Sequence, residues 1–438
     1  MLAILLAAGF FYPDIGSLPM GRGGTGAAGA GDLSAMEMNP AGLASLRGFT
    51  LQGEISSTWQ PIDFTRANTC GGTPCAAVSQ SSGAFPNTVS GLSWEVRDGL
   101  VVALGVYGPP SHGRENFPDP RVVKPILTQA PQRYSLISED NLVVYPGVGV
   151  GWRALDWLDV GAVLQLRYFR ANQVQSLYSL DNQKGEDPTF DAIATVDATE
   201  ALRPVFGLGA IARPLPGLSV GLSLRPSAPV HASGTIDVTL PSFAVAAGAT
   251  VTGSHGNVDL MQPPVARLGV RYDAARWSAM ADLVWENWGV LRTITVTPTD
   301  VVLQQGGTNF SVPPISLPRD WHASWSPRVG GEFVALDWLT LRAGALYESG
   351  AIPDETLQID FASLPRFAGT LGATARWRSL TFTASWAHYF QQERTISDSE
   401  AIRVDPYPAP AFVVGNGRYS TSLDVVAFQI SWLPFSRR

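Results

Sequence analysis

Apolar side chains recur at every second position over several segments of this sequence. The alternation runs through residues 158–168, 277–286, 339–348 and 380–386, where the intervening positions are polar or small. Because successive side chains of a β-strand point to opposite faces, each segment predicts a strand with one apolar face. The chain is therefore expected to fold as an all-β protein.

The connections between the predicted strands alternate in length. Short connections, such as 97–99, 155–157 and 336–338, are followed by long stretches rich in Pro and Gly, at about residues 61–87, 110–140, 171–200, 227–262, 291–325, 350–364 and 392–417. This spacing predicts about fourteen antiparallel strands with every long loop at one end. Short periplasmic turns and long extracellular loops are typical of a transmembrane β-barrel of the bacterial outer membrane.

Composition narrows the partners and the mode of membrane insertion. Only 15% of the 438 residues are charged, the net charge is −7, and no block of like sign occurs. A nucleic-acid surface needs clustered Lys and Arg, so no nucleic acid is expected as a partner. No apolar run approaches the roughly 20 residues of a transmembrane helix, so a closed barrel is the membrane-spanning fold that remains.

Tryptophans near the short connections support a barrel. They are expected to form an aromatic girdle at the lipid headgroups, and they are Trp152, Trp157, Trp277, Trp338, Trp377 and Trp432. The alternative is that they pack in the core of a soluble β-sandwich. Arg and Glu lie beside small residues on the opposite faces, which favours a polar or plugged lumen. The last strand, about 423–435, is expected to close the barrel against the first, about 48–59.

The amino terminus contains two features that are not strands. Residues 1–9 are apolar and are expected to be a short or truncated signal peptide, with a buried strand as the alternative. Residues 21–26, GRGGTG, match a dinucleotide-binding fingerprint but lack the flanking strand and helix, so no cofactor is predicted. The glycines are expected to allow close packing of the backbone.

Cysteine and histidine positions give little sign of a metal or catalytic site. Cys70 and Cys75 are expected to form a local disulfide rather than remain free thiols. The five histidines are scattered without metal-ligand spacing, and no G-x-S-x-G or Walker motif occurs, so neither a metal nor an enzyme is predicted. A barrel hydrolase is an alternative, and its candidate catalytic residue is His388, on a predicted strand.

Four parts of the sequence carry a resemblance to a known family. They are residues 21–43, 104–110, 211–234 and 325–354, and the most specific is Asn39-Pro40-Ala41-Gly42. In these residues the chain resembles the FadL-type outer-membrane transporters of long-chain fatty acids and other hydrophobic compounds, which include the TodX-like hydrocarbon channels. The resemblance implies a fourteen-stranded barrel over residues 48–435 and an N-terminal plug over residues 10–47, with a motif formed by Arg22, Gly23, Gly26, Asn39, Pro40, Ala41 and Gly42.

The resemblance also implies a route for the ligand. A hydrophobic molecule would be captured by the extracellular loops, pass to a lumenal pocket, and leave through a lateral opening at a kinked third strand when the plug moves. The matching strand is about 100–107, where Gly105, Gly108, Pro109 and Pro110 can interrupt ladder hydrogen bonds or simply end the strand. Arginines expected in the lumen are candidate contacts for a ligand carboxylate or members of a structural ion-pair network: Arg167, Arg267, Arg328 and Arg342. The acidic residues expected to pair with them in such a network are Asp159, Asp282, Glu332 and Glu348.

The function predicted first is therefore outer-membrane transport of fatty acids or other hydrophobic compounds. Its expected partners are a hydrophobic small molecule, outer-membrane lipid and the barrel assembly machinery, and the protein is expected to be a monomer. A general diffusion porin, a barrel hydrolase and a soluble sandwich are the alternatives, in that order.

Overall fold

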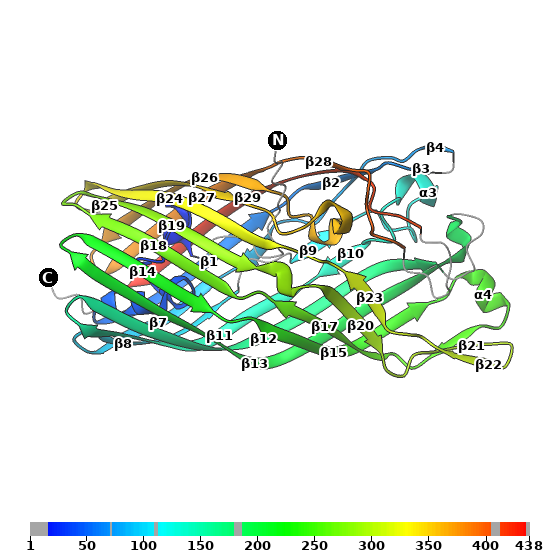
Figure 1. The fold of residues 1–438 in the computed structure, drawn as a ribbon, viewed down its shortest axis with the longest axis horizontal. Helices are drawn as coiled ribbons and strands as arrows, with labels where there is room; N and C mark the ends of the chain where they lie inside the picture. Colours follow the sequence, from blue (N-terminus) through cyan, green and yellow to red (C-terminus); the bar gives the residue numbers. More distant parts are fainter. Residues whose placement is uncertain (1–15, 71, 109–112, 179–185, 404–411, 435–438) are drawn as a thin grey trace.

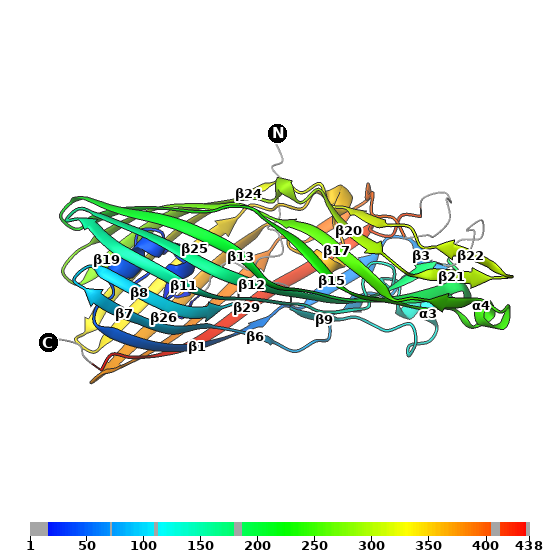
Figure 2. The ribbon, with the colours of Figure 1, turned by 90° about the horizontal axis from the view of Figure 1, so that it is seen from below.

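Fourteen antiparallel strands form one closed sheet around a lumen (Figures 1 and 2). The computed structural model describes residues 16–70, 72–108, 113–178, 186–403 and 412–434, so the predicted signal peptide, 1–9, lies outside the described residues. The strands of the wall are β1 (Phe49–Trp59), β7 (Val89–Arg97), β8 (Leu100–Tyr107), β11 (Leu142–Leu155), β12 (Leu158–Tyr178), β13 (Asp191–Leu215), β14 (Leu218–Arg225), β18 (Val265–Asp273), β19 (Trp277–Asn287), β24 (Ala323–Leu336), β25 (Leu339–Glu348), β26 (Arg366–Trp377), β27 (Leu380–Gln391) and β29 (Gly417–Trp432).

The barrel closes between its first and last strands, as the sequence predicts. β1 pairs with β29 in a continuous antiparallel register from Leu51 opposite Trp432 to Trp59 opposite Asp424. Closure leaves no unpaired edge in the wall, which a hydrocarbon environment requires. The last strand begins earlier than expected, at Gly417, and ends at Trp432.

Short turns join the strands at one end of the barrel. The long connections between wall strands, called the long excursions below, project from the other end (Figure 1). The excursions contain further strands: β2 (Ile62–Arg66), β3 (Thr69–Cys70), β4 (Thr73–Pro74), β5 (Val78–Ser79), β6 (Phe85–Asn87), β9 (Arg114–Asn116), β10 (Ser138–Asp140), β15 (Ala228–Thr239), β16 (Thr250–Thr252), β17 (His255–Gln262), β20 (Thr293–Pro298), β21 (Val302–Gln305), β22 (Thr308–Ser311), β23 (Ile315–Pro318) and β28 (Arg394–Ile396). They also contain the short helices α3 (Ile126–Gln129), α4 (Ser242–Ala246), η2 (Pro188–Phe190), η3 (Trp288–Val290), η4 (Asp354–Thr356) and η5 (Ile359–Phe361).

Two of the predicted long loops are mostly strand, so that part of the prediction is wrong. β12 and β13 stay paired from the short turn out to Tyr178 opposite Asp191, through most of residues 171–200. β15 and β17 form a second paired extension within residues 227–262. These paired extensions lie beyond the apolar wall, and polar residues such as Gln and Thr occupy both of their faces. They therefore lack the apolar alternation by which a wall strand is predicted.

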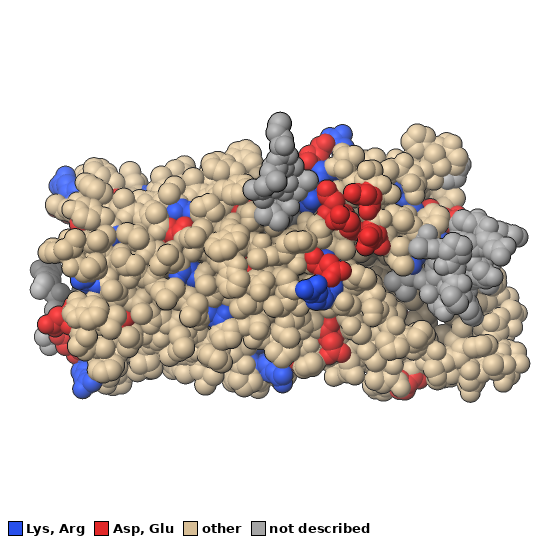
Figure 3. All heavy atoms as spheres, in the orientation of Figure 1, with Lys and Arg blue, Asp and Glu red and all other residues tan. Residues whose placement is uncertain are grey.

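The outer wall is apolar. Large apolar side chains such as Leu164, Phe206 and Leu268 are about half exposed on it. In Figure 3 charged atoms are sparse on the left, short-turn half of the molecule and gather in a cluster nearer the long loops. The six tryptophans named from the sequence are between 43% and 60% exposed, which confirms that they belong to an outer girdle rather than to a core. No helix among the described residues is both long and apolar enough to cross a bilayer.

The amino-terminal segment, residues 16–47, lies inside the barrel at its short-turn end (Figures 1 and 2). It contains α1 (Ser17–Met20), α2 (Ala35–Met38) and the 3-10 helix η1 (Pro40–Ser45). α1 packs on β26 and β27, and η1 packs on β11, β12 and β13. The segment therefore contacts opposite parts of the wall.

Candidate functional site

Asn39 fixes the centre of the amino-terminal segment. Its side chain is fully buried, and its amide nitrogen donates to the carbonyl oxygens of Ala27 at 2.6 Å, Ala210 at 3.1 Å and Leu222 at 3.3 Å. Its amide oxygen accepts from the Ala41 N–H at 3.1 Å and so caps η1, with Pro40 at the first position. One side chain thus joins two turns of the segment to β13 and β14.

Replacing Asn39 by Ala should loosen this anchor. The buried carbonyls of Ala27, Ala210 and Leu222 would lose a donor, at a cost of about 2 kcal/mol in the free energy of docking the segment. We expect faster trypsin cleavage after Arg22, which is 1% exposed in the intact protein. Asn309→Ala, at an exposed position on β22, is the control; an unchanged cleavage rate in Asn39→Ala would contradict the anchoring role.

Arg22 organises the glycine-rich turn before Asn39. Its guanidinium donates to Glu332 Oε1 at 2.6 Å and to the carbonyl oxygens of Thr25, Gly29 and Ala30 at 2.7–3.0 Å. The chain therefore winds around a buried cation, and Gly23 has a φ of 71°, a left-handed conformation that favours glycine. The Gly26 N–H donates to Asp282 Oδ2 of the wall at 2.7 Å. The GRGGTG segment is therefore a turn at the barrel wall rather than a nucleotide-binding loop.

Glycines on the inner wall lie directly against the amino-terminal segment. At each of six positions a Cβ atom would overlap the segment: Gly151 with Ala44, Gly161 with Pro40 and Ala41, Gly209 with Asn39, Gly221 with Ala27, Gly330 with Arg22, and Gly344 with Gly23. We call these six residues the glycine socket. Because these six wall residues have no side chain, the backbone of the segment can approach the backbone of the wall closely. Docking of the segment depends on this close approach.

Polar side chains form a layer where α2 of the amino-terminal segment faces the long-loop end of the lumen. Glu37 accepts hydrogen bonds from Arg225, from the Tyr107 hydroxyl and, at 2.9 Å, from Arg267. Gln165 joins the same layer through Arg225, at 3.0 Å. The amino-terminal segment is thus tied by one carboxylate to β8, β14 and β18.

The four arginines proposed as ligand contacts all point inward, but protein groups already satisfy them. Arg167 contacts Glu200 and, at 2.7 Å, Gln262. Arg267 binds Glu37, Arg342 binds Glu332 at 2.8 Å, and Arg328 donates to the Gly24 carbonyl at 3.2 Å. They lie in separate contacts rather than in one clamp.

Acidic residues expected as partners of these arginines also make other contacts. Glu332 binds Arg342, as expected. Asp159 binds Arg153 and Arg213, Asp282 accepts from backbone N–H groups of the amino-terminal segment, and Glu348 binds Arg366. The alternation predicts which face a side chain occupies, but pairing across the lumen depends on the three-dimensional path of the segment.

The third strand, β8, is shorter than its neighbours. It pairs with β7 and β11 up to Tyr107, with Gly105 inside the ladder and a register shift on β7 near the short turn. The Gly108 N–H still donates to the Thr88 carbonyl at 3.2 Å. Pro109 and Pro110 lie outside the described residues. Beyond the end of β8 the wall holds a cavity of about 310 Å³. Its lining includes Ile55, Phe85, Asn87, Gly108, Leu142 and Val144.

Apolar side chains fill the space between the polar layer and the long loops. They form one buried cluster, which includes Phe64, Tyr107, Tyr145, Phe169, Trp288 and Trp321. Tyr107 and Tyr145 stack at 5.2 Å between ring centres. Both rings belong to the apolar cluster, and the Tyr107 hydroxyl contacts Glu37, so this pair lies at the boundary of the apolar cluster and the polar layer. An apolar interior of this kind suits a hydrophobic ligand.

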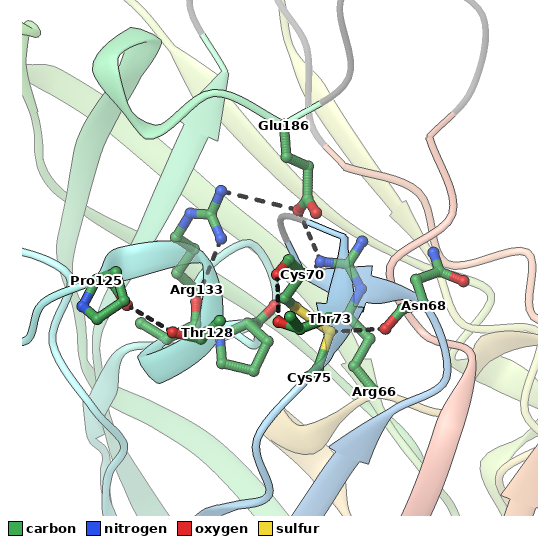
Figure 4. The surroundings of a disulfide bond; sticks show 11 residues. Arg66, Asn68, Cys70, Thr73, Cys75, Pro125, Thr128, Arg133 and Glu186 are labelled. Atoms are coloured by element: carbon green, nitrogen blue, oxygen red, sulfur yellow. Dashed lines mark hydrogen bonds and ion pairs between the residues drawn. A yellow bond between two sulfur atoms is a disulfide. The ribbon is translucent and has the colours of Figure 1, made fainter.

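The long loops are joined to one another above the lumen. Cys70 and Cys75 form a disulfide, and Arg66, close to it in sequence, binds Glu186 at 2.7 Å (Figure 4). Arg133 binds Asp191 at 2.6 Å. These contacts connect the first, second and third long excursions. An apolar groove nearby is lined by residues that include Leu177, Val196, Ile236, Val296 and Leu317.

Two carboxyl groups are buried together where the second excursion crosses the barrel. Glu115 of β9 is opposite Glu139 of β10, and each residue is 3% exposed. Burial raises the pKa of both carboxyl groups well above the ordinary value of 4.5, and the charge of Asp360 raises it further. Glu139 also faces Arg319, whose charge acts in the opposite direction.

The second excursion should lose stability as pH rises. Above about pH 4.5 the unfolded excursion releases these protons while the folded one keeps them, so the folded form binds more protons. Its stability should fall by up to about 1.4 kcal/mol per pH unit for each extra proton. The rate of trypsin cleavage after Arg133, recorded over a range of pH, measures the stability of the second excursion. Glu139→Gln should weaken the dependence of this stability on pH. Glu393→Gln, at an exposed position, should leave the dependence unchanged. A profile that rises in stability with pH would contradict this assignment.

His388, the candidate for a hydrolase, lies on the outer face of β27. Ala387 and Tyr389 on either side of it are fully buried, and its Nδ1 lies 2.9 Å from Asp424 Oδ1. It therefore faces away from the lumen. In the described part of the chain no group of three or more His, Cys, Asp and Glu residues is arranged to hold a metal ion.

Sequence reasoning missed the Glu37 layer. Glu37 is an acidic residue in the otherwise apolar AMEM stretch just before Asn39, and Arg225 continues the inward-facing set Ser219, Gly221 and Ser223 on β14. Both signals are visible in the sequence. What it does not reveal is that α2 brings the carboxylate to that strand.

Comparison with known proteins gives one family and a set of similar structures. Residues 142–430 match the family described as outer membrane protein transport protein (OMPP1/FadL/TodX). A FadL homologue of Pseudomonas aeruginosa is 17% identical, with 97% of this chain and 99% of that one covered and a TM-score of 0.78. The Pseudomonas putida toluene transporter TodX is 15% identical, with 97% and 99% covered and a TM-score of 0.65.

A third similar structure is the Ralstonia pickettii toluene transporter TbuX. It is 15% identical, with 95% of this chain and 98% of that one covered and a TM-score of 0.65. No curated protein matches the sequence. At these identities the structures establish a shared fold.

Proposed function

Because the chain belongs to the outer membrane protein transport protein family (OMPP1/FadL/TodX), an outer-membrane family of hydrophobic-compound transporters, we propose that it imports long-chain fatty acids or similar hydrophobic molecules. The observation that carries this proposal is a continuous apolar cluster inside the barrel, bounded at one end by the amino-terminal segment and at the other by joined loops. A ligand of this class needs an apolar path past the polar outer surface of the membrane.

The proposed route has three stages. The apolar groove among the extracellular excursions captures the ligand, and the lumenal cluster receives it. Residues 10–47 act as a plug whose movement permits release, and residues 48–435 form the barrel. The cavity beyond β8, next to Gly108, is the proposed lateral exit, because β8 ends at Tyr107, opposite Tyr145, while the neighbouring β11 extends three residues further, to Leu142.

The nature of the ligand is part of the proposal. The similar proteins TodX and TbuX are toluene transporters, so a neutral hydrocarbon is the other candidate class. Inward-facing arginines such as Arg225 and Arg267 support a ligand with a carboxylate. We also propose that the protein works as a monomer, inserted by the barrel assembly machinery and surrounded by outer-membrane lipid.

Uptake of labelled long-chain fatty acid tests the function. Cells without a transporter of their own should gain saturable uptake when this protein is present at their surface. The same barrel with the lumen blocked by Ala232→Trp, a fully buried position in the apolar cluster, should lose it. Surface protein without uptake of either fatty acid or toluene would refute the proposal.

A general diffusion porin and a barrel hydrolase are the alternatives. A porin would show a steady ion conductance, whereas the buried amino-terminal segment should keep the conductance of this protein low. A hydrolase would lose lipase activity in His388→Ala. The outward position of His388 gives no support to a lumenal hydrolase.

A further inference from the structure

Two ionisable side chains lie together on the outer, lipid-facing wall of the barrel. His388 of β27 and Asp424 of β29 are opposite each other in the ladder, and their side chains are 24% and 36% exposed. His388 Nδ1 lies 2.9 Å from Asp424 Oδ1, and the Trp386 indole N–H donates to the same oxygen at 3.1 Å. We call these three residues the outer polar site. The proposed transport route runs through the lumen and uses none of them.

Large apolar side chains flank the outer polar site along the strands. Phe390 and Phe367, which are opposite each other, are exposed on the side of the long loops. Leu371 and Val426, the residues opposite Trp386 on its two neighbouring strands, are exposed on the side of the short turns. The site therefore lies within the apolar band of the wall and not beyond its edge.

Strand geometry gives the depth of the site in the bilayer. Trp432 belongs to the girdle at the short-turn end, and β29 pairs with β27 without a register shift from Trp432 to Asp424. At the usual rise and tilt of a barrel strand, this stretch spans about 20 Å of an apolar band that is roughly 25 Å tall. The outer polar site therefore faces the outer leaflet, just inside its polar margin.

Two polar atoms of the site are available to the bilayer. Among the described residues, Asp424 Oδ2 and His388 Nε2 have no hydrogen-bond partner. A carboxylate can only accept, so the contact with Asp424 uses the hydrogen on His388 Nδ1, and Nε2 of an imidazole with one hydrogen is then an acceptor. The Trp386 N–H is already used. The site thus presents two free acceptors to the bilayer, where polar groups without partners are costly.

We propose that the outer polar site binds an outer-leaflet lipid that carries a hydroxyl or an amide N–H where its acyl chains begin. Such a lipid supplies the donors that Asp424 and His388 need, whereas an ester-linked chain offers only acceptors at that level. Lipopolysaccharide is a lipid of this kind, because its acyl chains are joined to a disaccharide partly by amide bonds and carry hydroxyl groups. The inference concerns the outside of the barrel and does not depend on the ligand carried in the lumen.

Aromatic rings hold the site in a fixed geometry. The Phe390 ring meets the His388 ring edge-on, with 4.3 Å between ring centres, and the Trp386 ring stacks on the other neighbour position at 6.2 Å. Trp59 of β1, opposite Asp424, is exposed beside them. Tryptophan suits the boundary between acyl chains and headgroups. Acceptors that are already ordered lose little conformational entropy when a lipid binds.

The test compares two lipids that share a headgroup. Sphingomyelin and phosphatidylcholine both carry phosphocholine, but sphingomyelin has an amide N–H and a hydroxyl where phosphatidylcholine has two esters. The purified full-length protein in detergent is titrated with each lipid, and the bound lipid is counted by native mass spectrometry. Wild type should bind sphingomyelin at least about tenfold more tightly, because sphingomyelin alone can donate to the two acceptors.

Removal of both acceptors should remove this preference. His388→Phe combined with Asp424→Leu replaces them by apolar side chains, which suit a lipid-facing wall, so the barrel should stay folded, as heat-modifiable migration on gels will show. This double variant should bind the two lipids equally. Ser57→Val, at an exposed position of β1 opposite Val426, adds an apolar side chain outside the site and should keep the preference of the wild type.

Lipopolysaccharide itself gives the second readout. Protein extracted from outer membranes should retain lipopolysaccharide, and the double variant should retain several-fold less than Ser57→Val. Equal binding of sphingomyelin and phosphatidylcholine by the wild type would overturn the proposal, as would a preference that survives in the double variant. A wild-type dimer in detergent that the double variant loses would show that the site contacts a second copy of the chain, which also overturns the lipid site.

Discussion

Gly161→Val should displace the amino-terminal segment from the wall of the barrel. A Cβ atom on Gly161 would overlap the backbone of Pro40 and Ala41, and backbone at this position cannot move aside without breaking the contacts of Asn39. Overpacking of this kind costs about 3 kcal/mol or more. We expect rapid trypsin cleavage after Arg22 and a raised ion conductance, while the barrel itself stays folded.

Gly369→Val is the matched control for this substitution. Gly369 is also a wall glycine, on β26, but nothing lies within 4 Å of the place where its Cβ would be. It therefore adds the same side chain to a strand without touching the segment. Heat-modifiable migration on gels shows that each variant forms a barrel. If Gly161→Val leaves both cleavage and conductance at the level of Gly369→Val, the glycine socket does not hold the segment.

The wall of the barrel follows from short-range patterns in the sequence. Alternation over residues 158–168 places Asp159, Gln165 and Arg167 inward and Leu164 outward, as observed, because strand geometry fixes the face of each side chain. Turn spacing gives the strand number, and closure of β1 on β29 follows from the need to pair both edges.

Long-range contacts in the lumen do not follow from such patterns. Nothing local to Arg267 or Arg225 indicates that Glu37, far away in the sequence, will bind both. The glycine socket is similarly hidden, because Gly151, Gly161 and Gly209 look like ordinary small residues of a strand until the segment is placed against them. Pairing of this kind depends on the path of the chain through the lumen and not on its periodicity.

Deletion of residues 10–43 should convert the protein into a leaky channel without selective uptake. Within residues 16–43 the deletion removes α1, α2 and most of η1, and with them the buried contacts of Arg22 with Glu332 and of Asn39 with β13 and β14. The short-turn end of the lumen would then be lined by polar groups such as Glu332, Arg342, Arg267 and Arg225, which water can solvate. Ion conductance in planar bilayers should rise strongly as a result.

Loss of selective uptake should accompany the leak, because the deletion also removes Glu37 and its contacts with Tyr107 and Arg225 of the wall. The wall strands begin at Phe49, so the hydrogen-bonded ring and its closing pair remain in the shortened chain. Insertion is checked by heat-modifiability and surface labelling before uptake is compared. A correctly inserted deletion protein with unchanged fatty-acid uptake and low conductance would show that the segment is neither a plug nor a gate, and that the lumen is closed by the loops and their buried apolar cluster alone.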